Sequence, residues 1–420
     1  MAYSNDSMNA PAQQLLEFEE ALAVVQRHAS AMAPPPVESV PLAEARGRVL
    51  AAAIAADRDQ PPFHRSTRDG FAVRAAELQA GALAVAGTIH AGEQWVGGAL
   101  QSGSAIEIMT GAPVPAGADA VVMVEHTCTV GARIALAEGR AIAAGENIVP
   151  AGSEARAGEM LLAPGRRLGA AEIALAASCG AASVSVYRRP RVAILATGDE
   201  LVEPAATPLP HQIRNSNSYA LAALVEDAGG EAVRLPTAAD TRTALDAAVH
   251  GALDCDLLLL SGGVSAGKRD LVEPALAALG AEFLFTGVLM QPGKPVVFGR
   301  VPPRGQRREQ FFFGLPGNPV STQVTFLAFA QCMIAALSGA ADGAPRFVQA
   351  QLAEEVQVKP GLTRFLPAIL THDLRRPQVQ IIASQGSGDL AANARANCYA
   401  VFPEGSSTVG AGRSITVLLR

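Results

Sequence analysis

Four loops in the second half of the chain combine glycines with small polar and charged side chains, and each follows an apolar run. They span residues 197–200, 261–270, 291–295 and 314–321. Glycine lets backbone amides approach oxyanions closely, and the N-terminus of a following helix adds partial positive charge. Lys268 and Lys294 add full positive charges. This composition predicts a site for a phosphorylated ligand.

Three carboxylates belong to the same part of the sequence, namely Glu200, Asp240 and Asp270. Carboxylate oxygens are preferred ligands of Mg²⁺, which commonly bridges phosphates, so these residues are the predicted metal ligands. Any one of the four loops alone is more typical of turn geometry and helix capping. Four such loops together favour a binding site.

One loop also resembles a nucleotide-binding P-loop. Gly262, Gly267 and Lys268 have the required spacing, after an apolar run and before a predicted helix. The next residue is Arg269, where the motif needs Ser or Thr to hold Mg²⁺. A P-loop that hydrolyses nucleotides is therefore disfavoured, and measurable ATP or GTP hydrolysis would revive it.

Two polar clusters precede these loops, at residues 61–73 and 109–115. Both predict loops, with Asp69 and Thr110 as polar contributors and Gly70 as a turn residue. An Asx turn or a helix cap is the alternative interpretation of Asp69. The seven histidines and five cysteines show no metal-ligand spacing, and scattered cysteines are typical of reduced thiols in a cytoplasmic protein.

The elements that would position the four loops alternate between strand and helix. Apolar runs predict strands at residues 192–196, 232–235, 257–260, 283–290 and 311–313, and helices are predicted at 218–228, 241–253, 271–279 and 320–337. This alternation predicts a parallel sheet covered on both faces. Loops that follow parallel strands meet at the carboxyl edge, where open α/β folds bind ligands. The four loops are therefore expected to converge on one crevice.

The first half of the chain predicts smaller units. Helical periodicity predicts helices at residues 15–32, 42–56 and 170–178, and the prolines at 34–36 end the first of them. Short β-like runs from residue 61 to residue 147 predict a small, mostly β domain. Packing of the helix at 170–178 with the N-terminal helices would make that domain an insertion within a discontinuous helical domain.

Residues after the α/β region predict one further unit. The stretch 338–345 has the composition of a linker. Beyond it, alternating runs that end at residues 415–419 predict a small β barrel or sandwich. Residues 301–310 are polar and predict a solvated hairpin rather than a basic binding patch.

Length and charge limit the possible functions. A chain of 420 residues is expected to form about three or four domains. The net charge of −6 argues against a general nucleic-acid binder, although local amides and lysines still permit anionic ligands. No uninterrupted apolar run approaches the roughly 18 residues of a membrane span. The first ten residues lack the pattern of a secretory signal, so a cytoplasmic protein with no membrane partner is expected.

The motifs taken together resemble the MoeA/gephyrin family of molybdopterin molybdenumtransferases, from about residue 10 to the C-terminus. The resemblance rests on PPFxxSxxDGFAVRA, EIMTGAPVPAGADAVV, GENI, RVAILATGDEL, SGGVSAGKRD, PGKP and GLPGNPVS. It implies a multidomain α/β plus β fold with four domains. These are a discontinuous helical domain at 10–56 and 147–185, an inserted β domain at 57–146, a molybdopterin-binding parallel α/β domain at 186–338 and a C-terminal β barrel-like domain at 345–420.

The resemblance also implies an activity. Such a homodimer takes adenylylated molybdopterin and molybdate, inserts the metal with the help of Mg²⁺, and releases AMP in a cleft between subunits. The adenylyltransferase that supplies the substrate is a candidate partner. The implied catalytic residues are Asp69, Thr110, Glu200, Asp240, Asp270 and Lys294, of which Glu200, Asp240 and Asp270 hold the metal. The implied cofactor-binding residues are Gly198, Gly262, Gly263, Ser265, Pro316, Gly317, Asn318 and Ser387.

The chain departs from the family pattern where an oxyanion pocket is implied. Many members have Lys at the position of Gln291, and many have Arg near residues 365–368, where this chain has Pro367. Ser387 still matches a predicted oxyanion contact, and Arg364 or Arg395 is a candidate for the missing charge. The Arg-rich stretch often found after GENI is absent at 149–154, and Arg68 stands where Met is common. An active insertase is the leading hypothesis, and a carrier or scaffold that binds molybdopterin without inserting metal is the alternative.

Overall fold

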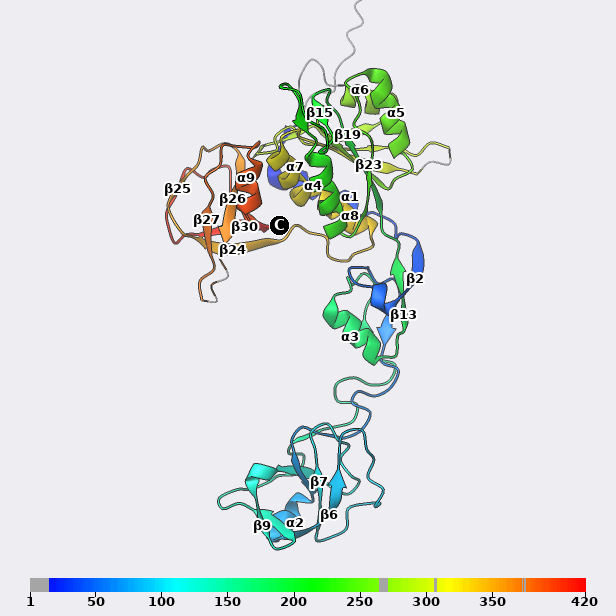
Figure 1. The fold of residues 1–420 in the computed structure, drawn as a ribbon, viewed down its shortest axis with the longest axis vertical. Helices are drawn as coiled ribbons and strands as arrows, with labels where there is room; N and C mark the ends of the chain where they lie inside the picture. Colours follow the sequence, from blue (N-terminus) through cyan, green and yellow to red (C-terminus); the bar gives the residue numbers. More distant parts are fainter. Residues whose placement is uncertain (1–14, 264–270, 306–307, 372, 374) are drawn as a thin grey trace, which may run out of the picture.

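The computed structural model describes residues 15–263, 271–305, 308–371, 373 and 375–420. Figure 1 shows an elongated molecule in which an α/β unit and a β barrel lie side by side at one end. A small unit that contains α3 (Ala170–Ser178) follows, and a separate β sheet occupies the opposite end. The multidomain α/β plus β fold predicted from the sequence is confirmed.

The α/β unit is built on a six-stranded mixed sheet. Its strands, in spatial order, are β17 (Glu231–Arg234), β14 (Arg191–Ala196), β18 (Leu257–Ser261), β23 (Gln310–Leu315), β22 (Val297–Val301) and β19 (Glu282–Phe285). The first four strands are parallel, as predicted, but β22 and β19 are antiparallel to their neighbours. The prediction of a wholly parallel sheet was therefore wrong at this edge. The connection at 301–310 is a hairpin, which can only return the chain antiparallel.

Helices and two hydrophobic cores cover the faces of this sheet. The helices are α4 (Asn217–Asp227), α5 (Arg242–Ala252), α6 (Val272–Ala278) and the continuous run α7 (Pro319–Thr325), η3 (Phe326–Ala330) and α8 (Gln331–Leu337). Val192 and Ile194 of β14 point into one core, whereas Ala193 and Leu195 point into the other. Successive side chains of a strand face opposite sides, so a strand covered on both faces is apolar throughout.

The run from α7 to α8 is the central helix of the larger core. The helix has 19 residues, and an 18-residue window within it has a mean hydropathy of 1.6, so by length and composition it could cross a membrane. However, 83% of that window is buried inside the protein. Burial against other protein segments accounts for its apolar character, as in the core helix of a globular domain.

The predicted strand at 283–290 is broken into three pieces. After β19 the chain forms β20 (Gly287–Val288), which pairs with β1 (Leu15–Leu16). It then forms β21 (Met290–Gln291), which pairs with a strand of the barrel. Thr286 and Gly287 interrupt the apolar run where β19 ends, and the pieces on either side join three different sheets.

The N-terminal helix α1 (Phe18–Ser30) belongs to the α/β unit in its packing. Phe18 and Val25 lie in the larger core, and the helix packs against α8. The ring of Phe18 also lies 5.1 Å from that of Phe365 in the barrel. The expected packing of this helix with residues 170–178 is therefore wrong.

The second predicted helix, at 42–56, does not form. Only the short 3-10 turn η1 (Leu42–Glu44) and the strand β3 (Ile54–Ala55) are present in that stretch. Gly47 adopts a φ of +75°, which is outside the helical region, so a helix cannot continue through it. Leu50 instead bonds to the backbone of Arg166 and bridges to Val186.

Pairing between distant segments makes the terminal β sheet an insertion. The strand β2 (Val37–Pro41) pairs with β13 (Ser183–Tyr187), and β3 pairs with β12 (Met160–Leu162). The chain between them forms β4 (Arg65–Ser66), β5 (Gly70–Val73), α2 (Ala75–Ala80), β6 (Leu83–Ile89), β7 (Ser104–Ile108), β8 (Ala120–Met123), η2 (Val124–His126), β9 (Thr127–Val130), β10 (Arg133–Leu136) and β11 (Ile148–Val149). Six of these strands form one sheet, in the order β8-β5-β7-β6-β10-β9.

The C-terminal unit is a closed barrel. Its strands, in order, are β26 (Thr363–Leu370), β27 (Gln378–Ile381), β24 (Phe347–Leu352), β30 (Ser414–Leu419) and β28 (Cys398–Phe402), and β28 closes on β26. The remaining elements are β25 (Val356–Gln357), β29 (Thr408–Val409) and α9 (Leu390–Arg395). Phe365 and Tyr399 of the barrel belong to the larger α/β core, so the two units share one hydrophobic interior.

Candidate active site

A cavity of about 620 Å³ lies at the carboxyl ends of the parallel strands, and we call it the edge cavity. Loops after β14, β18 and β23 line it together with Pro295, so the predicted convergence of the four loops is present. Its polar lining residues are Thr197, Glu200, Arg214, Asn215, Ser216, Asn217 and Ser261. Gly262, Pro316, Gly317 and Asn318, which were predicted as ligand contacts, also line it.

Glycines allow the loops of the edge cavity to approach one another. Gly262 has a φ of +91°, and a Cβ there would lie 2.9 Å from the carbonyl oxygen of Thr197. Gly198 has a φ of +145°, and its Cβ would lie 2.7 Å from the Glu200 carboxylate. Both positions lie in the left-handed range, which disfavours a side chain, and at Gly262 a side chain would also force the loop away from the backbone of Thr197.

Asn217, the first residue of α4, ties three segments of the edge cavity together. Its Nδ2 donates to Ser261 Oγ and to the Gly317 carbonyl oxygen, each at 2.8 Å. Asn217 was not among the site residues predicted from the sequence. A signal was present in the polar run at 214–217 directly before a predicted helix, but the run follows a short excursion through β15 (Leu201–Val202) and β16 (Ile213–Arg214) rather than a core strand.

The predicted carboxylates are only partly brought together. Glu200 lines the edge cavity, whereas Asp240 lies beside it and its backbone N–H donates to Asp199 Oδ1 at 3.0 Å. Asp270, like Ser265 and the P-loop residues Lys268 and Arg269, lies outside the described residues. Within the part of the chain that the structure describes, three or more metal-ligating side chains do not cluster. This donor set suits Mg²⁺, which is usually held by one or two carboxylates together with substrate phosphates and water.

A second cavity of about 560 Å³ lies between the α/β unit and the barrel, and we call it the seam cavity. It adjoins the edge cavity, because Pro295, Pro316 and Asn318 line both. Its polar lining residues are Gln291, Lys294, Asn318, Ser321, Arg364, Ser384 and Ser387. Asn318 Nδ2 donates to Ser387 Oγ at 2.9 Å, which links the two units across the cavity.

The loop that carries Lys294 is held closely against the core. The Lys294 carbonyl oxygen accepts from the Val288 N–H at 2.9 Å. Gly293 has a φ of +117°, and a Cβ there would lie 2.5 Å from the Thr325 side chain. The backbone of this loop is therefore fixed, while the Lys294 side chain remains exposed at the cavity.

Asp69 and Thr110 form a pair in the inserted β sheet. Asp69 Oδ1 accepts from the Thr110 N–H at 2.6 Å and from the Thr110 hydroxyl at 2.8 Å. These two bonds, the backbone one first, hold the pKa of Asp69 below its ordinary value of 3.8. Gly70 next to it has no room for a side chain, because a Cβ would lie 1.8 Å from the Val122 carbonyl oxygen.

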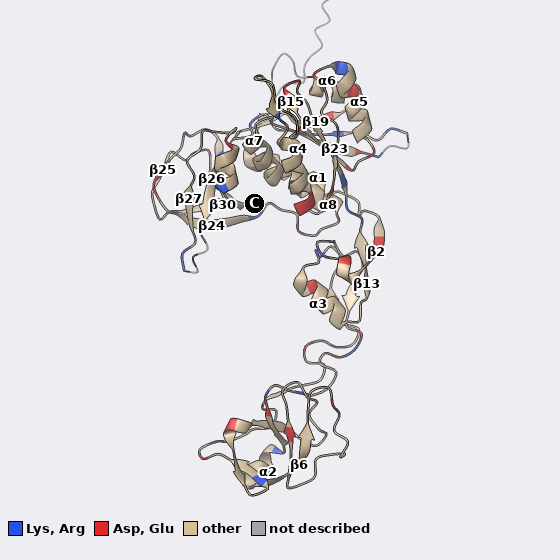
Figure 2. Ribbon diagram, in the orientation of Figure 1, with Lys and Arg blue, Asp and Glu red and all other residues tan. Residues whose placement is uncertain are grey.

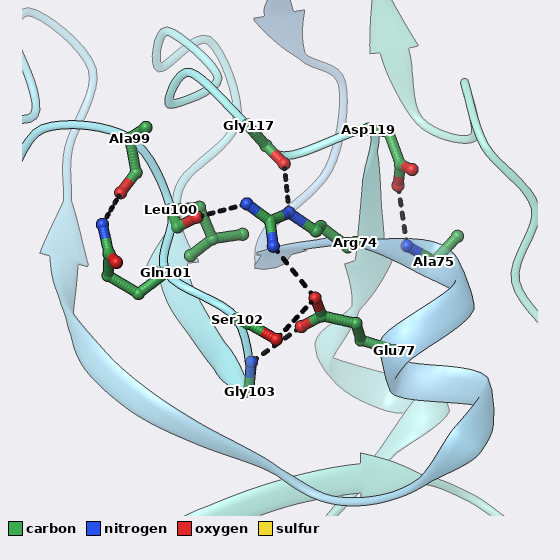
Figure 3. A network of polar contacts seen from close by, with 10 residues as sticks. All are labelled: Arg74, Ala75, Glu77, Ala99, Leu100, Gln101, Ser102, Gly103, Gly117 and Asp119. Atoms are coloured by element: carbon green, nitrogen blue, oxygen red, sulfur yellow. Dashed lines mark hydrogen bonds and ion pairs between the residues drawn. The ribbon is translucent and has the colours of Figure 1, made fainter.

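A second polar network lies in the same inserted sheet, at the other end of β5 from Asp69, and ties its loops together (Figure 3). Arg74 donates to the carbonyl oxygens of Leu100 at 2.7 Å and Gly117 at 3.1 Å, and it pairs with Glu77 at 2.9 Å. Asp119 Oδ1 accepts from the Ala75 N–H at 2.7 Å at the start of α2. Gly117 and Asp119 of the motif at 109–119 therefore have an architectural role.

Within one chain the Asp69–Thr110 pair and the edge cavity lie far apart. Figure 1 shows the inserted sheet and the α/β unit at opposite ends of the elongated molecule. Figure 2 shows acidic and basic residues interspersed over the ribbon, so local groups rather than a charged face give each cavity its electrostatics.

Comparison with known proteins accounts for nearly the whole chain. Residues 16–180 match the MoeA N-terminal region (domain I and II), and residues 349–419 match the MoeA C-terminal region (domain IV). Residues 193–336 match a probable molybdopterin binding domain. A molybdopterin molybdenumtransferase of Nostoc sp. is 36% identical over 91% of this chain and 88% of its own length. The chain belongs to the MoeA family.

Other MoeA-family relatives extend this result to structure. A molybdopterin molybdenumtransferase of Haemophilus influenzae is 33% identical over 91% of this chain and 94% of its own length. The crystal structure of the molybdopterin biosynthesis MoeA protein from Pyrococcus horikoshii OT3 superposes with a TM-score of 0.78, at 29% identity. The superposition covers 97% of this chain and 100% of the Pyrococcus horikoshii chain. The edge cavity lies mainly in residues 193–336, which match the molybdopterin binding domain. The seam cavity lies between those residues and residues 349–419, which match the MoeA C-terminal region.

Proposed function

We propose that this protein is a molybdopterin molybdenumtransferase, a transferase of molybdenum cofactor biosynthesis. Its substrates are adenylylated molybdopterin and molybdate, and its products are the molybdenum-loaded pterin and AMP. The observation that carries the proposal is the adjacency of two unlike cavities in the regions that match the molybdopterin binding domain and the MoeA C-terminal region. Relatives named for this activity match about nine-tenths of the chain.

The edge cavity binds the adenylylated pterin. Gly198, Gly262 and Gly263 leave the backbone here without side-chain cover, so a phosphorylated ligand can approach the loops closely, although the N–H groups of Gly198 and Gly262 already donate to the carbonyl oxygens of Ala238 and Leu315. Asn217 fixes the loops after β18 and β23 relative to each other, so the groups that contact the phosphate are in position before the ligand binds. Pro295, Pro316 and Asn318 form the wall that this cavity shares with the seam cavity.

Carboxylates at and beside the edge cavity would hold the divalent cation. Its ligands would be Glu200, which lines the cavity, Asp240, which lies beside it, and Asp270, which is outside the described residues. When bound, Mg²⁺ neutralises phosphate charge and assists cleavage of the phosphate bond. In the seam cavity, Lys294 and Ser387 bind molybdate next to the pterin, so that both substrates are held close together.

A second copy of the chain completes the site. Asp69 and Thr110 face solvent in the inserted sheet, far from both cavities of their own chain. In a homodimer with two-fold symmetry, the inserted sheet of one subunit meets the cavities of its partner. Asp69 then acts as an ionised carboxylate at the edge of the partner's site, because its two bonds to Thr110 keep it deprotonated. The five free cysteines suit an enzyme that acts in the reducing cytoplasm.

The activity is tested by incubating the purified protein with adenylylated molybdopterin, Mg²⁺ and molybdate. AMP release and reconstitution of a cofactor-free molybdoenzyme are measured for the wild type and for Glu200→Gln. We expect both signals from the wild type and the loss of both in the variant. Tight binding of the adenylylated pterin without AMP release would contradict the proposal and would match a carrier.

A further inference from the structure

The seam cavity contains two cations and no opposing carboxylate. Lys294 and Arg364 line it, and none of the described lining residues is Asp or Glu. Among the described residues, neither cation takes part in an ion pair. Two uncompensated positive charges in one concave pocket favour an anion there.

Arg364 reaches this cavity because a strand of the α/β segment joins the barrel. Gln291 of β21 lies directly beside Arg364 of β26 in a parallel pair. The Gln291 amide oxygen accepts a hydrogen bond from Arg364 Nη1, and the Lys359 carbonyl oxygen accepts from Arg364 Nε at 2.6 Å. A guanidinium has five N–H donors, so three remain for a ligand.

The residue type at position 291 is matched to this arrangement. A glutamine oxygen orients the guanidinium without cancelling its charge, whereas a glutamate would neutralise it. A lysine at 291 would place a third positive charge against Arg364. Gln291 and Arg364 are therefore matched to each other in charge and in hydrogen bonding.

We propose that Arg364, oriented by Gln291, is a binding residue of this protein for a tetrahedral dianionic oxyanion, beside Lys294 in the seam cavity. With Lys294, it gives the cavity its second positive charge. Arg364 contacts the anion, and Gln291 is a positioning residue. The inference rests on the proposed function for the identity of the anion, but not for the existence of the anion site.

Equilibrium dialysis of labelled molybdate against the full-length protein, without pterin, tests the inference. Arg364→Ala is expected to raise the Kd for molybdate about 10-fold to 100-fold, the range for a hydrogen bond to a charged group. Arg364→Lys, which keeps the charge but loses the planar fork, should fall between the two. The matched control is Arg395→Ala, because Arg395 of α9 does not line the cavity. Equal molybdate affinity of Arg364→Ala and the wild type would overturn the proposal.

A second experiment separates charge placement from simple damage. Gln291→Lys is introduced into the wild type and into the Arg364→Ala background. We expect it to strengthen molybdate binding in the Arg364→Ala background and to leave it unchanged or weaker in the wild type, where a third cation adds repulsion. The same effect of Gln291→Lys in both backgrounds would contradict the coupling.

Two further measurements distinguish this inference from the proposed function. Binding of adenylylated molybdopterin reports on the edge cavity and should be unchanged in Arg364→Ala, which also shows that the variant is folded. Competition by tungstate and by sulfate identifies the anion. If every variant lacks AMP release but Arg364→Ala still weakens molybdate binding, the proposed function fails and the anion site stands. If the wild type releases AMP and Arg364→Ala binds molybdate normally, the proposed function stands and the role of Arg364 fails.

Discussion

The edge and seam cavities are neighbours of similar size but opposite character. The edge cavity, about 620 Å³, combines the Glu200 carboxylate with glycine backbone, and its Arg214 already donates to the carbonyl oxygens of Pro204 and Ala206. The seam cavity, about 560 Å³, has Lys294 and Arg364 and no described carboxylate. The difference matches the proposed division of one site into a metal-and-phosphate side and an oxyanion side.

The largest effect that distinguishes the cavities is expected from Lys294→Ala. Loss of this charge should lower the rate of molybdenum insertion roughly 100-fold, the effect of removing one donor to a developing anion. The affinity for adenylylated molybdopterin should stay close to the wild-type value, because Lys294 does not line the edge cavity. Single-turnover AMP release and pterin binding measure the two quantities. Lys359→Ala is the control. A parallel loss of pterin binding in Lys294→Ala would contradict the assignment of the two substrates to separate cavities.

Asn217→Ala tests the comparison from the other side. The change removes both bonds that hold the edge loops, so pterin affinity should fall by about 10-fold, while molybdate affinity is retained. Fluorescence titration with the pterin and dialysis with molybdate separate the outcomes. Equal losses in both titrations would show that Asn217 supports the whole crevice rather than one side.

A smaller effect is expected where the barrel docks onto the α/β unit. The Tyr399 hydroxyl donates to Asn393 Oδ1 at 2.7 Å, and Asn393 donates to Gln323 Oε1 at 2.9 Å, all in buried positions. Tyr399→Phe should lower the free energy of unfolding by about 1 kcal/mol, since it leaves a buried acceptor unpaired. Tyr219→Phe, which removes an exposed hydroxyl bonded to Glu203, should change it by less than about 0.5 kcal/mol. Urea unfolding of the two variants measures the change in the free energy of unfolding. Equal changes in both variants would show that the Tyr399 hydrogen bond does not stabilise the docked barrel.

The smallest effect concerns the pKa of Asp69, which lies in neither cavity of its own chain. Its carboxyl should titrate below 3.8 in the wild type, so its bonds to Thr110 stabilise the fold above that pH and are lost as the pH falls through the lowered pKa. Thr110→Val removes the hydroxyl donor but keeps the stronger backbone donor, so the pKa should rise only part of the way. Carbon-detected NMR of Asp69 measures both values. A pKa at or above 3.8 in the wild type would show that the pair does not form.

The sequence predicted what local patterns determine. Apolar runs such as 192–196 and 257–260 located the strands of the buried sheet, and the glycine-rich loops after them located the edge cavity. Partner choice over long distances was not visible, because periodicity does not record which sheet a segment joins. For that reason the run at 283–290 was assigned to one strand, and the helix at 15–32 was grouped with the wrong unit. Arg364 was only one of two candidates, and its pairing with Gln291 depends on β21 leaving the α/β sheet.

The central claim, that each site combines the cavities of one chain with Asp69 of another, is tested most directly by subunit mixing. Asp69→Ala and Lys294→Ala are purified separately and then mixed, or co-expressed with two tags. Each variant alone should be nearly inactive in AMP release. A mixed dimer has one intact site and one doubly altered site, so a random mixture should recover about a quarter of the wild-type activity. Mixed dimers that form but stay as inactive as their parents would contradict the shared site.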